Sequence, residues 1–359
     1  MEPLIFVLIS GLLARLSAPA IRALFANLNF TDQQNWRKTN FQPIPLAGGT
    51  LLFVLVPAIS MLFSYLSTLS ILNLNVLFLW ICAIIIFTLG LIDDIYDVRA
   101  SLKLIVQIVV ATIMVISTDL HLESFQGLFN LYKIPSTFSL LLTGMLYLVF
   151  INMFNLIDGV DGLSSGIGIV ATLFTASLAI YFNLGDLIII SCVFLGVLIV
   201  FYRWNHYKLE KKMYLGDNGS MLLGLLMTYF LLSVLNQSNG IENTWKDSFL
   251  KVNPVLFMTL FSYPLLDLIR VFTIRVVNGE SPFKADRRHV HHRLSDLGLS
   301  HLQISLIVMA YTVFATVIAI ILTPMLSINS LFLCLGLFTA MVVYSPFIFL
   351  FKIKSSPHD

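Results

Sequence analysis

Adjacent carboxylates mark the first of four unusual polar clusters in a strongly apolar sequence. Asp93 and Asp94 stand together in GLIDDIYDVRASLK, and Asp97 follows them. Helical spacing of three or four residues predicts that Asp97 shares one face with this pair. Carboxylates that close repel each other unless a cation lies among them, and Arg99, Lys103 or a divalent metal ion would supply it. A solvated loop is the alternative.

A second acidic segment, NLIDGVDGL, lies between two apolar runs. Asn155, Asp158 and Asp161 recur every three residues, so a helical turn would align them. Ionisable residues at membrane depth are costly and indicate a functional site. The alternative is a tight turn with capping residues, which explains one Asp well but explains two Asp and an Asn poorly.

The third cluster is YLGDNGSMLLG, in which Asp217 precedes an apolar run. Asp217 would either cap the helix that begins there or hold a metal ion next to phosphate bound at the helix N-terminus. Both interpretations place a carboxylate at the start of the eighth predicted span.

The fourth cluster, NGESPFKADRRHVHHRL, combines Arg287 and Arg288 with His289, His291 and His292. Neighbouring histidines on one segment rarely complete a tetrahedral zinc site. Arg and His donate hydrogen bonds to phosphate oxygens, which favours an anion-binding loop. A loop that binds lipid headgroups is the alternative. Together, the four clusters indicate magnesium-assisted phosphate chemistry without identifying the reaction.

The elements that carry these clusters are predicted to be transmembrane helices. Hydrophobic residues make up 58% of the 359 residues and charged residues 11%, against about 25% charged residues in soluble domains. Apolar runs of about 20 residues match the length of a helix that crosses a bilayer. We therefore predict an all-α polytopic membrane protein with eleven spans, a count of ten being the alternative. The predicted spans cover residues 3–24, 45–66, 72–92, 102–118, 137–156, 160–182, 186–203, 218–236, 252–274, 303–323 and 328–351.

The distribution of positive charge predicts the orientation. Alternating loops place seventeen Lys and Arg on one side and three, Lys133, Lys246 and Lys251, on the other. Positively charged loops stay in the cytoplasm, so the N-terminus is predicted outside, the C-terminus inside, and all four clusters at the cytoplasmic face. The first span lacks a basic segment and a cleavage site, so we expect a retained helix.

Four motifs in register resemble the polyprenyl-phosphate N-acetylhexosamine-1-phosphate transferases. They are GLIDDIYDVRASLKLIVQ, NLIDGVDGLSSG, GDNGSMLLG and SPFKADRRHVHHRL, and PIPLAGG upstream is similar to the segment that enters the second span. The resemblance covers nearly the whole chain. It implies one transmembrane transferase domain over residues 1–359, with cytoplasmic catalytic loops near residues 93–103, 155–165, 203–220 and 275–302.

The reaction that the resemblance implies joins a sugar phosphate to a lipid. Undecaprenyl phosphate attacks the β-phosphorus of a UDP-sugar, lipid-diphospho-sugar forms and UMP leaves. The His-x-His-His form is similar to the N-acetylglucosamine branch, which implies UDP-N-acetylglucosamine as donor. Another UDP-N-acetylhexosamine or UDP-N-acetylmuramoyl-pentapeptide is the alternative. The product would begin cell-envelope polysaccharide synthesis, including lipopolysaccharide, at the bacterial inner membrane.

The resemblance also implies roles for the acidic residues. Asp217 is the expected ligand of Mg²⁺, with Mn²⁺ as the alternative ion. Asp158 would lie next to the metal ion or the diphosphate, with Asp161 near it. Asp93 and Asp94 would face the lipid phosphate, with Asp93 as the candidate base.

Substrate contacts are implied for nine further residues. By resemblance, Lys103 contacts phosphate, Tyr214 stacks on uracil, and the remaining residues bind the donor: Asn155, Asn205, Arg287, Arg288, His289, His291 and His292. Two features depart from the family pattern. Gln42 and Leu46 replace basic residues common in relatives, and the segment 205–217 is about two residues longer than in relatives and lacks the usual Pro-Ala.

A membrane transporter and a non-catalytic membrane scaffold are the alternative classes of function. A transporter would tend to show inverted repeats and charges near the bilayer midplane, and a non-catalytic scaffold would not need the acidic clusters. No nucleic-acid partner is expected. The resemblance leaves a homodimer open.

Overall fold

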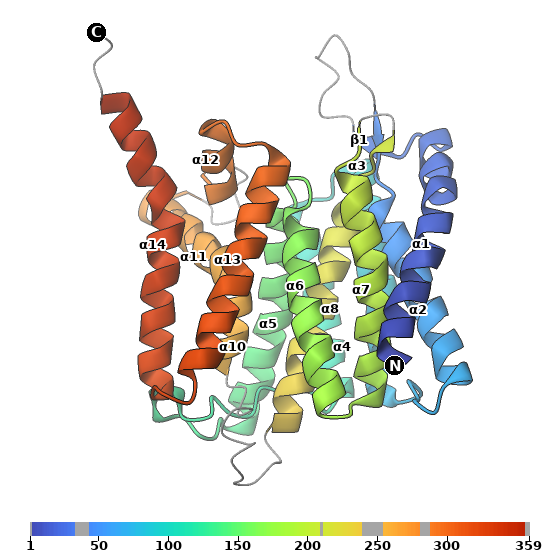
Figure 1. Ribbon diagram of the computed structural model, residues 1–359, viewed down its shortest axis with the longest axis horizontal. Helices are drawn as coiled ribbons and strands as arrows, with labels where there is room; N and C mark the ends of the chain where they lie inside the picture. The colour runs from blue at the N-terminus through green and yellow to red at the C-terminus, as the bar shows by residue number, and fades with distance from the viewer. Residues whose placement is uncertain (1, 33–42, 209–210, 239–253, 281–287, 356–359) are drawn as a thin grey trace. The chain divides into compact units, whose positions relative to one another are not determined.

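The computed structural model describes residues 2–32, 43–208, 211–238, 254–280 and 288–355, with side chains up to residue 347. The chain divides into two compact units, and Figure 1 labels the helices and strands of both. Unit 1 contains Met1–Glu123 and Ile134–Gly240, and unit 2 contains Ser124–Lys133 and Ile241–Asp359. The prediction of a single transferase domain over residues 1–359 stays a prediction.

Unit 1 is built from helices and one short antiparallel strand pair. Its elements are α1 (Glu2–Asn27), β1 (Thr31–Asp32), β2 (Ile44–Pro45), α2 (Gly48–Leu66), α3 (Leu74–Tyr96), α4 (Ala100–Ser117), α5 (Ser136–Ile157), α6 (Leu163–Tyr181), α7 (Gly185–Asn205) and α8 (Asp217–Ser238). The strands pair Thr31 with Pro45 and Asp32 with Ile44.

Unit 2 is helical in its described residues. Its elements are η1 (Leu128–Asn130), α10 (Pro254–Leu260), α11 (Ser262–Val277), α12 (Val290–Asp296), α13 (His301–Leu322) and α14 (Ile328–Ser355). Helices α10, α11 and α12 pack against α13 and α14.

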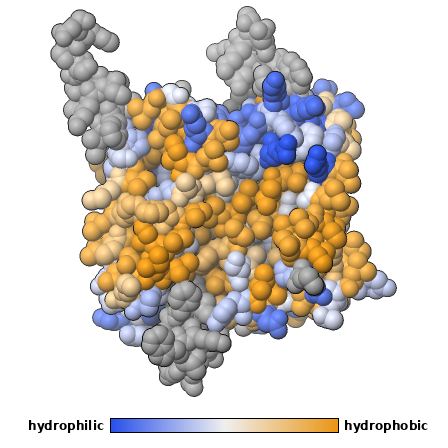
Figure 2. Space-filling model, in the orientation of Figure 1, coloured by the Kyte–Doolittle hydropathy of each residue, from blue (hydrophilic) through white to orange (hydrophobic). Residues whose placement is uncertain are grey.

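The described chain contains ten helices that are long and apolar enough to cross a membrane. This confirms the predicted all-α polytopic class. The ninth predicted span is broken, because α10 and α11 meet at a bend of 79°, and counting this pair as one span gives eleven. On unit 1, Figure 2 shows hydrophobic side chains over the middle of the face formed by α6 and α7. The predicted orientation across the membrane stays a prediction.

Helix α8 forms the centre of unit 1. Its sequence is hydrophobic on all sides, which is typical of a helix buried among others, and 94% of its most apolar 18-residue window is buried. It packs against α2, α3, α5 and α6. Asp217, the first residue of α8, therefore lies among these neighbouring helices.

Glycines allow the backbones of α2 and α3 to reach the first turn of α8. A Cβ atom on Gly49 would lie 2.4 Å from the Gly219 backbone nitrogen, and a Cβ atom on Gly90 would lie 2.3 Å from the Asn218 Cα atom. Real Cβ atoms do not approach backbone so closely. The position of the first α8 turn therefore depends on the absence of side chains at these two sites.

We expect Gly90→Ala to destabilise the protein by about 1–3 kcal/mol or more, because the new methyl group forces backbone apart. The apparent Tm in detergent measures the effect. The matched control is Gly144→Ala on α5, where a Cβ atom would meet only Val115 Cγ2 at 3.9 Å and alanine is the better helix former. Equal Tm values for the two variants would contradict this account of the packing.

Candidate active site

The N-terminus of α8 receives a carboxylate from a different helix. Asp94 on α3 accepts hydrogen bonds from the backbone nitrogens of Asp217, at 2.8 Å, and Asn218, at 3.3 Å. The first N–H groups of a helix have no partner within it and favour negative charge. Gly216 precedes them with φ +78°, and a Cβ atom there would lie 2.8 Å from an Asp94 oxygen. Asp94 thus fixes where α8 begins.

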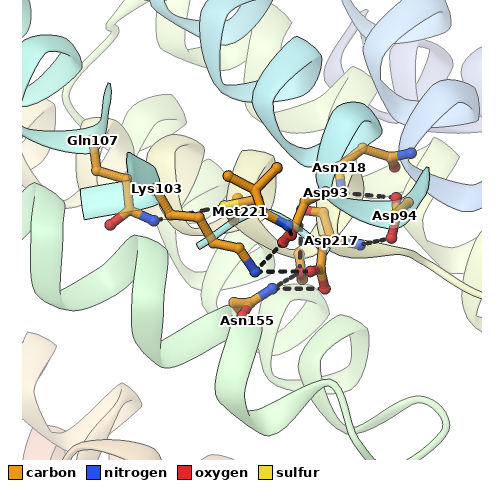
Figure 3. A network of polar contacts seen from close by, with 10 residues as sticks. Asp93, Asp94, Lys103, Gln107, Asn155, Asp217, Asn218 and Met221 are labelled. Atoms are coloured by element: carbon orange, nitrogen blue, oxygen red, sulfur yellow. Dashed lines mark hydrogen bonds and ion pairs between the residues drawn. The ribbon is translucent and has the colours of Figure 1, made fainter. Parts of the chain in front are cut away.

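The side chain of Asp217 meets residues from three other helices. Asn155 Nδ2 on α5 donates to Asp217 Oδ1 at 2.9 Å and to Ser220 Oγ at 3.0 Å. Lys103 Nζ on α4 lies 3.9 Å from Asp217 Oδ2. The Asp93 carboxyl group on α3 is within hydrogen-bonding distance of Asp217. Figure 3 shows Lys103, Asn155 and Asp93 turned towards Asp217. The structure therefore brings four predicted site residues together.

Asp93 is buried and holds Lys103. Its Oδ1 atom accepts from the Val98 backbone nitrogen at 2.9 Å, and its Oδ2 atom forms an ion pair with Lys103. Helix α3 ends at Tyr96, and Asp97 follows in the left-handed conformation and is exposed. The prediction that Asp97 extends the helical face of Asp93 and Asp94 is wrong, because the helix stops before it.

The second acidic segment forms the turn between α5 and α6. Asp158 follows the last residue of α5 and accepts a hydrogen bond from Ser164 Oγ on α6. Burial raises the pKa of the Asp158 carboxyl group well above its usual value, and the nearby carboxylates of Asp161 and Asp94 act in the same direction. Asp161 forms an ion pair with Lys212 at 2.5 Å. The two Asp residues of this segment therefore have different partners.

The segment that leads into α8 surrounds this turn. The Asn205 side chain accepts from the Gly162 backbone nitrogen at 2.5 Å and donates to the Met213 carbonyl at 3.0 Å. Lys212 Nζ lies 4.8 Å from the centre of the Tyr214 ring. Burial raises the pKa of the Tyr214 hydroxyl group. Asn205 ties the two loops together here, and its contact with the nucleotide stays a prediction.

The histidine segment belongs to unit 2 and contacts an aspartate, Asp267, that is not among the predicted site residues. Asp267 on α11 is 1% exposed. It accepts from His289 Nδ1 at 2.9 Å, from Arg270 at 2.8 Å and from the Val290 backbone nitrogen at 3.2 Å. The signal for Asp267 and Arg270 was present, because both ionisable residues lie in a run predicted to cross the membrane.

The other predicted residues of this segment differ in their surroundings. The ring of His291 is buried and stacks on His289, with centroids 5.5 Å apart and planes 4° apart, and it also contacts His292. Arg288 forms an ion pair with Glu280 at 3.0 Å. Arg287 lies outside the described residues, as does Gln42. Leu46 lies next to β2 and is half-buried.

Oxygen ligands for a hard cation are available around Asp217. Asp93 and Asp217 place two carboxyl groups in contact, with the Lys103 ammonium near both, and such a pair repels unless a proton or cation lies between its members. No three His, Cys, Asp or Glu side chains in the described ranges are arranged as a complete metal site. The donor set therefore fits Mg²⁺ held by one or two carboxylates together with substrate phosphate.

His291 generates a prediction about pH. Burial, reinforced by His292, lowers the pKa of His291 to about 3, from about 6.5 in the unfolded chain. The folded protein keeps the ring neutral, so stability is fully present above the unfolded pKa and falls as the pH drops below it. Between about pH 7.5 and about pH 5.5 the wild type should lose about 1.4 kcal/mol more than His291→Asn. Tm values of both proteins at the two pH values measure this, and parallel losses would contradict it.

Comparison with known proteins agrees with these motifs. The model described as Glycosyl transferase family 4 matches residues 76–235, from α3 to α8. The undecaprenyl-phosphate alpha-N-acetylglucosaminyl 1-phosphate transferase of Salmonella typhi is 30% identical over 287 residues, which cover 79% of this chain and 73% of that protein. The decaprenyl-phosphate N-acetylglucosaminephosphotransferase of Mycobacterium tuberculosis is 27% identical over 303 residues, or 80% and 74% of the two chains.

The family resemblance seen in the sequence is thereby confirmed. The four motifs lie on the ends of described helices or next to them, and the relatives match across both units of the chain. The chain is a multi-pass membrane transferase that belongs to glycosyl transferase family 4, the polyprenyl-phosphate N-acetylhexosamine-1-phosphate transferases.

Proposed function

We propose that the protein transfers N-acetylglucosamine 1-phosphate from UDP-N-acetylglucosamine to undecaprenyl phosphate. An oxygen of the lipid phosphate forms a bond to the β-phosphorus of the donor. The bond between this phosphorus and the oxygen that bridges to the α-phosphate breaks, and UMP leaves. The names of the relatives from Salmonella typhi and Mycobacterium tuberculosis support this donor sugar and a polyprenyl phosphate acceptor.

The observation that carries the proposal is the convergence of Asp93, Lys103, Asn155 and Asp217 at the start of α8. Phosphoryl transfer requires positioning and neutralisation of charge more than covalent help from the protein. A lysine and an amide donor next to two carboxyl groups supply both kinds of contact. A transporter would not require this arrangement, and membership in a transferase family counts against one.

Lys103 is the group best placed to bind the acceptor phosphate. The ion pair with Asp93 fixes its ammonium group, which also lies 3.9 Å from Asp217. A phosphate monoester is mostly dianionic at pH 7, since its second pKa is about 6. The attacking oxygen then needs no base, and we assign to Asp93 the task of holding Lys103. Asp94 holds the α8 backbone, as its two hydrogen bonds require.

Asp217 is the proposed Mg²⁺ ligand, with Asp158 as a second carboxyl group near the diphosphate. When bound, the ion would neutralise charge on the phosphate oxygens and on the leaving UMP. Asn155 orients the Asp217 carboxylate through its hydrogen bond. The site is proposed to face the cytoplasm at the bacterial inner membrane, in agreement with the excess of Lys and Arg on that side.

The first test is UMP release by purified protein supplied with undecaprenyl phosphate, Mg²⁺ and one UDP-sugar at a time. We expect release to require the lipid and the divalent ion and to be fastest with UDP-N-acetylglucosamine. Faster release with another UDP-N-acetylhexosamine would correct the donor. Absence of UMP with every sugar in the panel would refute the proposed reaction.

The second test replaces the proposed metal ligand. Asp217→Asn should lower kcat by roughly 100-fold or more, because a bound metal ion supplies several kcal/mol of transition-state stabilisation. Binding of Mn²⁺, followed by electron paramagnetic resonance, should weaken in parallel. This second readout separates a lost ligand from a lost catalytic contact.

Asp186→Asn is the matched control, because Asp186 also lies in the first turn of a helix of unit 1 and accepts a side-chain hydrogen bond, from Asn73 at 2.7 Å. We expect its activity and Mn²⁺ binding to equal those of the wild type. Wild-type rates and Mn²⁺ binding in Asp217→Asn would remove Asp217 from the site.

A further inference from the structure

Asp267 is an ionisable residue in the middle of an apolar helix. It lies on α11, where the neighbouring positions read PLLDLIRVF, and its side chain is 1% exposed. Burying a carboxylate is costly unless hydrogen bonds and opposite charge compensate for the lost water. The partners of Asp267 therefore indicate why it is there.

The two oxygens of Asp267 serve different partners. Oδ1 receives Arg270 Nη2 at 2.8 Å, and this contact already balances the charge of the carboxylate. Oδ2 receives His289 Nδ1 at 2.9 Å. Arg270 is fixed in turn by the Phe347 ring, 4.3 Å from its guanidinium carbon, and by the Arg288 carbonyl. Charge neutralisation alone would not require the contact with His289.

The contact with His289 decides which ring nitrogen is left for other partners. A carboxylate at Nδ1 holds the proton there, so Nε2 is the free atom of the ring. Among the described residues, His289 Nε2 and both nitrogens of His291 are buried without a hydrogen-bond partner. The two rings are stacked with planes 4° apart. Buried polar atoms without a partner are rare and require an explanation.

We propose that Asp267 is the positioning residue of the histidine segment, which fixes the proton of His289 on Nδ1 and thereby presents the unprotonated Nε2 atom as a hydrogen-bond acceptor to a hydroxyl or amide N–H group of the donor sugar. This inference rests on the proposed function, with the histidine segment in contact with the UDP-sugar donor as the family resemblance implies. Asp267 itself does not touch the substrate. It acts through the orientation and proton arrangement of His289, as carboxylates do for histidines elsewhere.

The direct test is the protonation of His289 in ¹⁵N-histidine spectra of the whole protein in nanodiscs. The signals are assigned by their loss in His289→Gln, among the 7 histidines of the chain. We expect a protonated Nδ1 in the wild type. In Asp267→Asn the amide oxygen should face Arg270 and the Val290 nitrogen, which places the amide N–H group on Nδ1 and moves the proton of His289 to Nε2.

The kinetic test separates the two substrates. Asp267→Asn should lower kcat/KM for the UDP-sugar by about 10- to 100-fold, as for other partners that orient a histidine, and leave KM for undecaprenyl phosphate unchanged. The double variant Asp267→Asn/His289→Gln should be no slower than the slower single variant, because both changes remove one function. Multiplicative losses, or equal losses for both substrates, would indicate a structural role only and overturn the inference.

Two further variants guard against misfolding. Asp267→Glu keeps the carboxylate and should keep Nδ1 of His289 protonated, with part of the activity restored. If Asp267→Asn does not fold, Asp267→Glu and the double variant Asp267→Glu/His289→Gln replace it in the comparison of single and double variants. Asp296→Asn, which removes an exposed carboxylate paired with Arg293 on α12, should match the wild type in every measurement.

The outcomes distinguish the two proposals. A wild type that releases no UMP with any UDP-sugar refutes the proposed function, while the ¹⁵N spectra still decide whether Asp267 fixes the proton on Nδ1. An active wild type with an unprotonated Nδ1, or an Asp267→Asn variant with wild-type kcat/KM, refutes the positioning role.

Discussion

The contact between the Asp94 carboxylate and the first N–H groups of α8 determines the geometry of the acidic cluster. Two backbone groups that a helix cannot satisfy by itself are bonded by one side chain from α3. The bond holds the start of α8 against α3, where Gly90 leaves room for the Asn218 backbone. Asp217 carries the first of these N–H groups, and its side-chain carboxylate consequently faces Asp93, Lys103 and Asn155. A backbone contact thus sets the positions of the side chains available for chemistry.

A second layer of polar side chains lies one helical turn from this cluster, within the helix bundle. Asn152 Nδ2 donates to Gln107 Oε1 at 2.7 Å, and Gln107 Nε2 lies 3.6 Å from Met221 Sδ. Gln107 follows Lys103 by one helical turn, and Asn152 precedes Asn155 by one turn, so the same helix faces carry both layers. Buried polar groups are costly unless bonded. The second layer therefore restrains α4 and α5 relative to α8 directly beneath Lys103 and Asn155.

The apolar runs predicted the helices because a bilayer requires about 20 apolar residues for each crossing. The break between α10 and α11 was less visible, although Pro264 was a signal, since proline favours the first turn of a helix. Motif spacing identified Asp93, Asn155 and Asp217 as site residues. It did not predict that Asp94 binds the first N–H groups of α8, because this contact depends on how α8 packs against α3. Asp267 was not among the predicted site residues because it stands outside the polar clusters of the sequence, and its partners His289 and Val290 lie 22 and 23 residues further along the chain.

The long segment before α8 changes the expectation for the nucleotide base. Lys212 is anchored by Arg22, which donates to its carbonyl at 3.0 Å, and its ammonium lies between Asp161 and the Tyr214 ring. A cation over an aromatic ring occupies the face on which a base would otherwise stack. Uracil stacked on Tyr214 must therefore use the opposite face or displace Lys212 from it. In the second case the Asp161 carboxylate would lose its ion pair at the moment of binding, and nucleotide recognition would be coupled to the turn between α5 and α6 that also carries Asp158.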